Sequence, residues 1–325
     1  MDRLGRLASD PARRAQLLEA LVSLEERKDL SQLPTLFAAR PGDPKELAYL
    51  DDALSASLDQ LIGAASPDAR RLLWMVAVAN DPVPLGLLRG VWSGESLEQE
   101  QLRQIKRMMD ILPQLPADVQ AELRSLPAEI RAKLDALSPE PPARPEMEPH
   151  LWELVSVGLA TEERTGPRDD NPNVTCHELV RERIRAWMAH QAQDRGEWTE
   201  KAVRLAYAER LAVAFESLQH ENMTTALEAG SQAIVYCVQA EAWDRLDGFA
   251  GAVVTGIGDP RLLERLIPHL RTAAESAPEG RPRWSCLCYL ADALARGGRP
   301  DASLSFYEEA AAQARAAAQA GEDGS

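Results

Sequence analysis

Hydrophobic residues recur with the 3.6-residue period of an α-helix along most of this chain. Between residues 46 and 62 the periodic set predicts one amphipathic helix; its members are Leu47, Leu50, Leu54, Leu58, Leu61 and Ile62. The segment 71–79 is almost wholly apolar after Arg71, a pattern typical of a helix that is buried on all sides. The chain is therefore expected to be mainly α.

Helix boundaries follow from the residues that punctuate this pattern. Ser66 and Pro67 precede the apolar segment as a capping residue and a first helical residue, and Asn80-Asp81-Pro82 ends it. A further short helix is predicted from Pro84 to Trp92. Residues 1–45 are predicted to form an N-terminal helical segment, which the cluster Pro41-Gly42-Asp43-Pro44 separates from the rest.

Residues 95–149 have the pattern of a proline-rich helical insertion. An eleven-residue sequence beginning Leu-Pro-Ala occurs twice in tandem, at 115–125 and at 126–136, and each copy predicts a short amphipathic helix. The prolines between Ser138 and Pro149 predict an extended linker.

Period-two alternation is confined to residues 159–176, between two helical segments. A helix from Glu148 to Ala160 leads into a strand, and a polar turn over 165–173 leads to a return strand at 174–176. A helix then runs from His177 to about residue 192. The order helix, helix, insertion, helix, hairpin, helix resembles a winged-helix domain with an expanded middle, which would occupy residues 46–192.

From residue 193 to 325 the pattern predicts paired helices. In the last pair, a set of mostly small and aliphatic residues recurs at helical spacing on both sides of the turn at Gly298 to Asp301; the set is Leu287, Leu290, Ala291, Leu294, Ser303, Tyr307 and Ala310. This spacing resembles a tetratricopeptide (TPR) unit, which implies an α-solenoid in which Ala291 and Ser303 let two helices approach and Tyr307 fills the gap beyond them. The alternative is an ordinary antiparallel helix pair.

Composition narrows the classes of function. With 51 acidic against 36 basic residues, the net charge of −15 disfavours nucleic acids and anionic membranes as partners. No apolar run is long enough to span a bilayer, and the N-terminus lacks an apolar signal core. Four cysteines without a paired framework indicate a reducing cytoplasm. The arginines at 181, 183 and 185 are interpreted as a solvated helix face.

Motifs for catalysis are absent from the sequence. There is no Gly-x-x-x-x-Gly-Lys-Ser/Thr loop to hold a triphosphate, and the five histidines are far apart without metal-ligand spacing. A nucleophilic Cys176–His177 dyad is disfavoured because the two residues are sequence neighbours. At Thr175 and Glu178 the sequence predicts a reciprocal capping box at a helix start.

The same helix start carries His177, Leu179, Val180 and Arg181, with Cys176 before and Glu178 within the motif. This resembles the Met-His-Asp-like element, His-x-Leu-Val-Arg, of the STAND or NB-ARC-like signalling NTPases. Over residues 45–325 the predicted order of a winged-helix-like domain and helical repeats is similar to theirs. The resemblance implies that His177 contacts the β-phosphate of ADP when an NTPase core is present, and that residues 1–45 are a remnant of the lid after that core.

These observations favour a non-catalytic regulatory or sensor module of a STAND-like ATPase, with no cofactor of its own and with ADP or ATP bound by a full-length parent. Its partner would be a protein that contacts the repeats, and further repeats or self-association are expected at the C-terminal end. The alternative is a winged-helix transcription regulator with a TPR-like ligand-sensing domain, although the helix 148–160 has no Arg or Lys for DNA. An enzyme with an unrecognised site is a third hypothesis.

Overall fold

The computed structural model describes residues 55–94, 146–164, 166, 171–191 and 196–322, with part of 102–136. The predicted segment 1–45 and most of the predicted linker after Ser138 lie outside these residues. The chain divides into two compact units, one from residues 1–92 and 143–199 and the other from 93–142 and 200–325.

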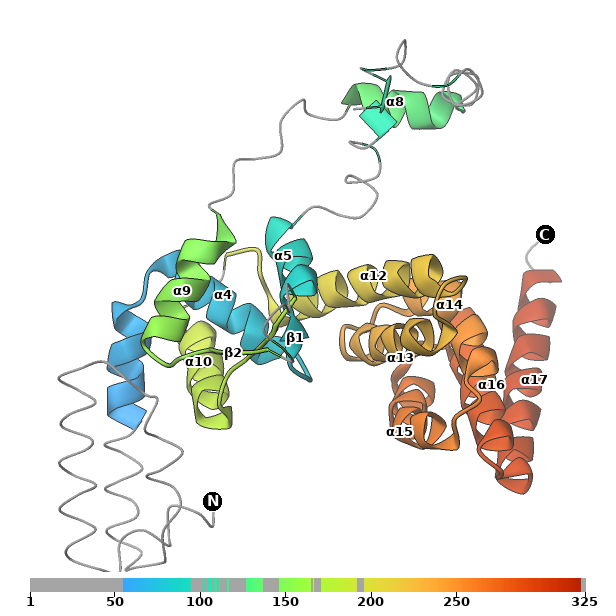
Figure 1. Ribbon diagram of the computed structural model, residues 1–325. Helices are drawn as coiled ribbons and strands as arrows, with labels where there is room; N and C mark the ends of the chain where they lie inside the picture. Colours follow the sequence, from blue (N-terminus) through green and yellow to red (C-terminus); the bar gives the residue numbers. More distant parts are fainter. Residues whose placement is uncertain are drawn as a thin grey trace, which may run out of the picture. The chain divides into compact units, whose positions relative to one another are not determined.

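Helices dominate both units, so the mainly α fold class is confirmed (Figure 1). The first unit has a helix over 55–64, followed by α4 (Pro67–Val78), β1 (Val83–Pro84) and α5 (Leu85–Ser93). Then come α9 (Met147–Ser156), β2 (Thr161–Glu163), β3 (Asn173–Thr175) and α10 (Glu178–His190). Among the described residues, these three short strands are the only extended elements that pair.

Helix α4 is the central helix of the first unit. Every residue from Leu72 to Val78 is buried, as the apolar run predicts, and α4 packs against α9, α10 and β3. Each large aliphatic side chain buried in this way stabilises the fold by about 1.5–3 kcal/mol. Ser66 is the N-cap with Pro67 after it, which confirms the predicted start.

The strands form one antiparallel sheet in the order β1-β3-β2. Val174 of β3 is fully buried and lies opposite Val83 on one side and Glu162 on the other. The hairpin of β2 and β3 was predicted, but β1 was not: Pro84, expected to begin a helix, pairs with Asn173, and the helix begins at Leu85. A two-residue strand is too short to show a period in the sequence.

The predicted helix 148–160 is wrong at its C-terminal end, since α9 stops at Ser156. Gly158 has a φ of 74°, and its N–H donates to Val155 O while the N–H of Leu159 donates to Leu154 O. These two bonds form a Schellman motif, in which a residue in the left-handed region reverses the chain. The four residues after α9 are therefore free to lead into β2.

In the second unit, part of the duplicated sequence is visible as a helix. The second copy forms α8 (Ala128–Ala136), as predicted, and Leu134 of this helix is buried. The carbonyl of Leu134 accepts a hydrogen bond from Lys106 Nζ at 3.3 Å. Most of the first copy lies outside the described residues.

The rest of the second unit is a series of helices, as predicted from Glu197 onward. They are α12 (Glu200–Leu218), α13 (Met223–Gln239), α14 (Trp243–Gly256), α15 (Pro260–Ser276), α16 (Arg281–Arg296) and α17 (Pro300–Glu322). Neighbours pack as α12 with α13, α13 with α14, α15 with α16, and α16 with α17. In addition, α13 packs against α15 and α14 against α16, so successive helix pairs stack on one another (Figure 1).

Close approach within this stack depends on small residues. A Cβ atom added to Gly230 of α13 would lie 2.5 Å from a methyl carbon of Val253 and 3.2 Å from the ring of Phe215. Real Cβ atoms essentially never lie within 3.0 Å of such an atom, so a larger residue here would displace Val253, and glycine lets α12 and α14 pack closely against α13.

Two of these helices end with the same Schellman motif as α9, but with different residues in the left-handed position. After α16 it is Gly298, with a φ of 79°, and the N–H of Arg299 donates to Leu294 O. After α13 it is Glu241, with a φ of 53°, and the N–H of Ala242 donates to Cys237 O. The Glu241 side chain forms an ion pair with Lys201, but both are largely exposed and such pairs contribute little.

We expect Glu241→Gly to stabilise the second unit by about 0.5–1 kcal/mol, because glycine adopts the left-handed conformation without the steric penalty of a side chain. Gly298→Ala, where an added Cβ meets nothing within 4 Å, should destabilise it by about the same amount for the same reason. Urea denaturation of both variants measures this, and shifts of the same sign would contradict the explanation.

Candidate functional site

His177, the predicted phosphate contact, is the N-cap of α10. Its side chain is exposed, and its Nδ1 atom accepts a hydrogen bond from the N–H of Leu179 at 3.3 Å. In the neutral ring the hydrogen is then on Nε2, which makes that atom a donor. The arrangement combines a ring donor with the positive end of a helix dipole, which suits an anion chemically.

The predicted capping box at Thr175 and Glu178 is wrong. Thr175 is the last residue of β3 and pairs with Thr161, so the strand extends too far for Thr175 to cap the helix. The cap is His177 instead, and the Glu178 carboxylate forms an ion pair with Arg181 at 3.3 Å. The sequence could not show this because the length of β3 depends on its pairing partners.

Arg181 connects the start of α10 to the end of α4. Its guanidinium donates to the carbonyl of Ala77 at 2.7 Å and also to the carbonyl of Ala79, and Arg185 donates to Ala77 O at 3.3 Å. Ala77 lies in the last turn of α4 and Ala79 is its C-cap, and the carbonyls at a helix end have no N–H of a following turn from which to accept a hydrogen bond. Two positive side chains therefore cap the negative end of a buried helix.

The interpretation of the arginine run as a solvated face is accordingly wrong. Besides Arg181 and Arg185, Arg183 forms a two-pronged ion pair with Asp59 of the helix 55–64, in which Nε lies 3.0 Å from Oδ1. All three arginines are used to fix α10 against other helices of the first unit. We infer that this run is structural.

Cys176, next to His177, is buried, and burial raises the pKa of its thiol to about 11. A nucleophilic cysteine needs the opposite shift, since the thiolate is the reactive form. The Cys176–His177 pair therefore lacks the lowered thiol pKa that a catalytic dyad needs.

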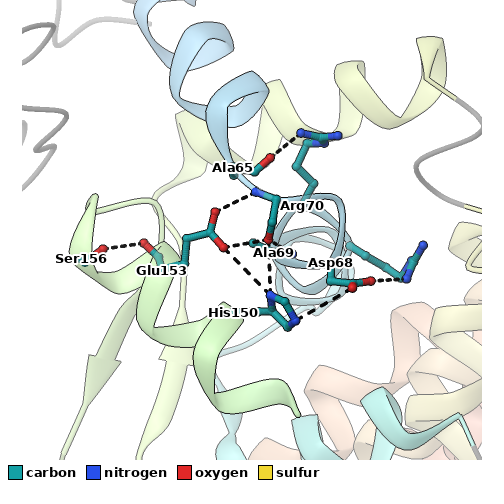
Figure 2. A network of polar contacts seen from close by, with 9 residues as sticks. Ala65, Asp68, Ala69, Arg70, His150, Glu153 and Ser156 are labelled. Atoms are coloured by element: carbon teal, nitrogen blue, oxygen red, sulfur yellow. Dashed lines mark hydrogen bonds and ion pairs between the residues drawn. The ribbon is translucent and has the colours of Figure 1, made fainter. Parts of the chain in front are cut away.

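A polar network that the sequence did not reveal lies at the other end of α4. Glu153 accepts hydrogen bonds from Ser66 N through Oε1 and from Ser66 Oγ through Oε2, both at 2.7 Å. His150, one turn earlier on α9, has Nδ1 3.3 Å from Ser66 Oγ and Nε2 3.9 Å from Asp68 Oδ2. Figure 2 shows Glu153 and His150 directed from α9 toward the N-terminal turn of α4.

This network contains a serine, a histidine and an aspartate, but its geometry is that of a helix cap. The Ser66 hydroxyl donates to Glu153 and accepts from the N–H of Ala69 at 3.2 Å, so its proton is not directed to the histidine. The 3.9 Å between His150 and Asp68 exceeds hydrogen-bond length. The spacing of His150 and Glu153, three residues apart on a helix, was the one available signal in the sequence.

The seven residues of the predicted repeat lie in α16 and α17, and the structure brings them together. Six are buried, with exposed fractions of 3 % or less: Leu287, Leu290, Ala291, Leu294, Ser303 and Ala310. Ser303 Oγ donates to the Pro300 carbonyl at 2.7 Å, which satisfies the one polar group among them.

Tyr307, the seventh, is half-buried and not enclosed. Its hydroxyl donates to Asp292 of α16, and this hydrogen bond, with a smaller contribution from burial, raises the pKa of Tyr307 to about 12. Tyr289 of α16 likewise donates to Asp247 of α14 at 2.8 Å. Each tyrosine thus joins one helix of the stack to another through an aspartate.

No group of three or more His, Cys, Asp or Glu residues in the described part of the chain is placed to hold a metal ion. Within the same residues, no helix has the length and apolarity needed to cross a membrane. No family model, curated protein or solved structure matches the chain.

We expect Ala291→Arg to destabilise the second unit by about 2–4 kcal/mol, because an arginine has no room and no partner where α16 meets its neighbours. Ala252→Arg, on an exposed position of α14, is the matched control and should change stability by less than about 0.5 kcal/mol. Thermal melting of both variants is the measurement. Equal small shifts would show that Ala291 is not enclosed in solution.

Proposed function

We propose that this chain is a non-catalytic regulatory or sensor module that binds proteins in the cytoplasm and belongs to a STAND-like signalling ATPase. The order of elements in the first unit is the observation that carries the proposal. A helix, a strand, a helix, a third helix and a hairpin follow one another as α4, β1, α5, α9 and β2-β3, and β1 joins the hairpin as its third strand. This order resembles that of a winged helix and supports the proposal.

His177 supports the proposal through its position. It stands two residues after the last strand of the sheet, as the N-cap of α10, and Arg181 of the same motif holds that helix start against α4. In a STAND-like parent, an NTPase core would bind ADP, and His177 would contact its β-phosphate. This chain contains no phosphate-binding loop, so its own residues would contribute one contact and no catalysis.

The second unit supports a role in protein binding. Stacked helix pairs form extended surfaces in which side chains of successive helices lie next to one another, and TPR-like repeats use such surfaces to bind protein segments. Alternate helices begin at a nearly constant spacing: α13 and α15 begin 37 residues apart, at Met223 and Pro260, and α14 and α16 begin 38 residues apart, at Trp243 and Arg281. Both spacings are close to the ~34 of a TPR unit.

We expect the full chain to bind neither ATP nor ADP with micromolar affinity, with or without Mg²⁺, because one histidine and one helix end offer too few donors for the phosphates. Isothermal titration calorimetry tests this. Micromolar binding would overturn the assignment as a module without its own nucleotide site. Repeating the titration with His177→Ala would then show whether α10 holds the phosphates.

A transcription regulator is the second candidate, because the outer face of α9, the helix that would enter DNA, is accessible. Trp152 on this face is 73 % exposed. The charge of the helix argues against DNA, however: it carries Glu148 and Glu153 and no Arg or Lys, and Glu148 forms an ion pair with Arg89. A face without positive charge lacks the phosphate contacts on which DNA affinity depends.

We therefore expect no binding to duplex DNA of mixed sequence at low salt, measured by fluorescence anisotropy up to ~10 µM protein. Binding that weakens steeply between roughly 50 and 200 mM salt would favour the transcription regulator. In that case Arg89→Ala, which removes the positive charge beside α9, should weaken DNA binding relative to the wild type at the same salt concentration.

A further inference from the structure

The outer face of α17 is open in the second unit. The side of this helix that faces α16 carries the buried Ser303 and Ala310, whereas the opposite side carries Leu304, Glu308, Ala311, Ala312 and Arg315, all exposed. Leu304 is 59 % exposed, one of the few large apolar side chains of the described residues to be so accessible. Within those residues, neither Glu308 nor Arg315 forms an ion pair with another side chain, and the Nε of Arg315 donates to the carbonyl of Ala311 at 3.2 Å.

The charges on this face are arranged symmetrically. Glu308 and Arg315 are seven residues apart, which is close to two helical turns, so both lie on one line along the helix. The midpoint of that line falls between Ala311 and Ala312. A second α17 running antiparallel through a twofold axis at this midpoint would place each Glu308 opposite Arg315 of the partner subunit.

The residues at the midpoint allow such a contact to be close. Two alanines present only methyl groups, so two helix axes can approach to the lower end of the usual 8–10 Å. Glu308 and Arg315 each lie about 5 Å along the helix from the axis, within the stretch where two crossing helices are nearest. Both ion pairs would therefore form on either side of the small-residue contact, with Leu304 partly covered beyond them.

From this self-complementary pattern we propose that the occupant of the α17 face is a second copy of this chain, in an antiparallel α17–α17 dimer. A twofold contact of this kind is isologous: the same patch serves on both subunits. The inference deepens the proposed function by naming one partner of the repeat unit and rests on the assignment of that unit to protein binding. A single helix face is a small interface, so the dimer should be weak.

Sedimentation velocity on the full chain tests the proposal with charge reversals. We expect the wild type to dimerise reversibly at concentrations between roughly 10 and 200 µM. Glu308→Arg and Arg315→Glu should each weaken the dimer at least ~10-fold, because each reversal turns two attractive pairs into two repulsive ones. The double variant should recover it.

A mixture of the two single variants gives the most discriminating test. One variant then presents two arginines and the other two glutamates, so an equimolar mixture should form a heterodimer at concentrations where neither variant associates alone. Arg261→Glu, on the exposed face of α15, is the control for net charge and should dimerise as the wild type does. All three substituted positions are exposed, and unchanged thermal melting will show that every variant is folded.

Three results would overturn the proposal: a wild type that stays monomeric at about 200 µM, single variants that dimerise as well as the wild type, or a mixture that associates no more than its components. These outcomes are independent of the nucleotide and DNA measurements. Failure of the dimer alone would leave the regulatory role intact, and nucleotide binding alone would leave the dimer intact.

Discussion

A largely buried helix requires protein atoms to satisfy the polar groups at its ends, and α4, in which every residue from Leu72 to Val78 is buried, meets this requirement at both ends through distant residues. At its start, Glu153 of α9 binds both the N–H and the hydroxyl of the capping Ser66. At its end, Arg181 and Arg185 of α10 bind the last carbonyls. These contacts fix which face of α9 and which face of α10 pack against α4. The packing of the three helices in the first unit follows from them.

The position of His177 is a consequence of the same constraint. Because Arg181 is held by the end of α4, the start of α10 is fixed four residues earlier, where His177 caps the helix. Cys176 and Val180 of the motif are buried and serve the core. His177 and Glu178 are the exposed residues of the motif, and the His177 imidazole, which caps α10 through Nδ1, is the group on which the proposed contact with a phosphate depends.

The second unit relies on a different physical device, the close approach of helices through small residues. Gly230 permits contact with Val253 and Phe215, and Ala291 and Ser303 lie buried in the last pair. Inner helices of the stack are covered both by the next helix and by the one after it, as α13 is by α14 and α15. Helix α17 packs on α16, and the small residues and opposite charges of its other face are what suggest a second copy there.

Sequence alone determined those features that depend on short-range pattern: the helical class, the buried helix with its Ser66 cap, the hairpin, and the paired helices with a glycine turn at Gly298. These follow from periodicity and from the conformations that serine, proline and glycine favour. Tertiary structure decided the rest. The strand β1 and the cap at His177 in place of Thr175 depend on pairing partners that no local pattern contains. The end of α9 is marked locally by Gly158, and the predicted helix 148–160 ran past this signal. The roles of Arg181, Arg183 and Glu153 could not be predicted because their partners lie 87 to 124 residues away in the chain, and only folding brings those groups within hydrogen-bond distance.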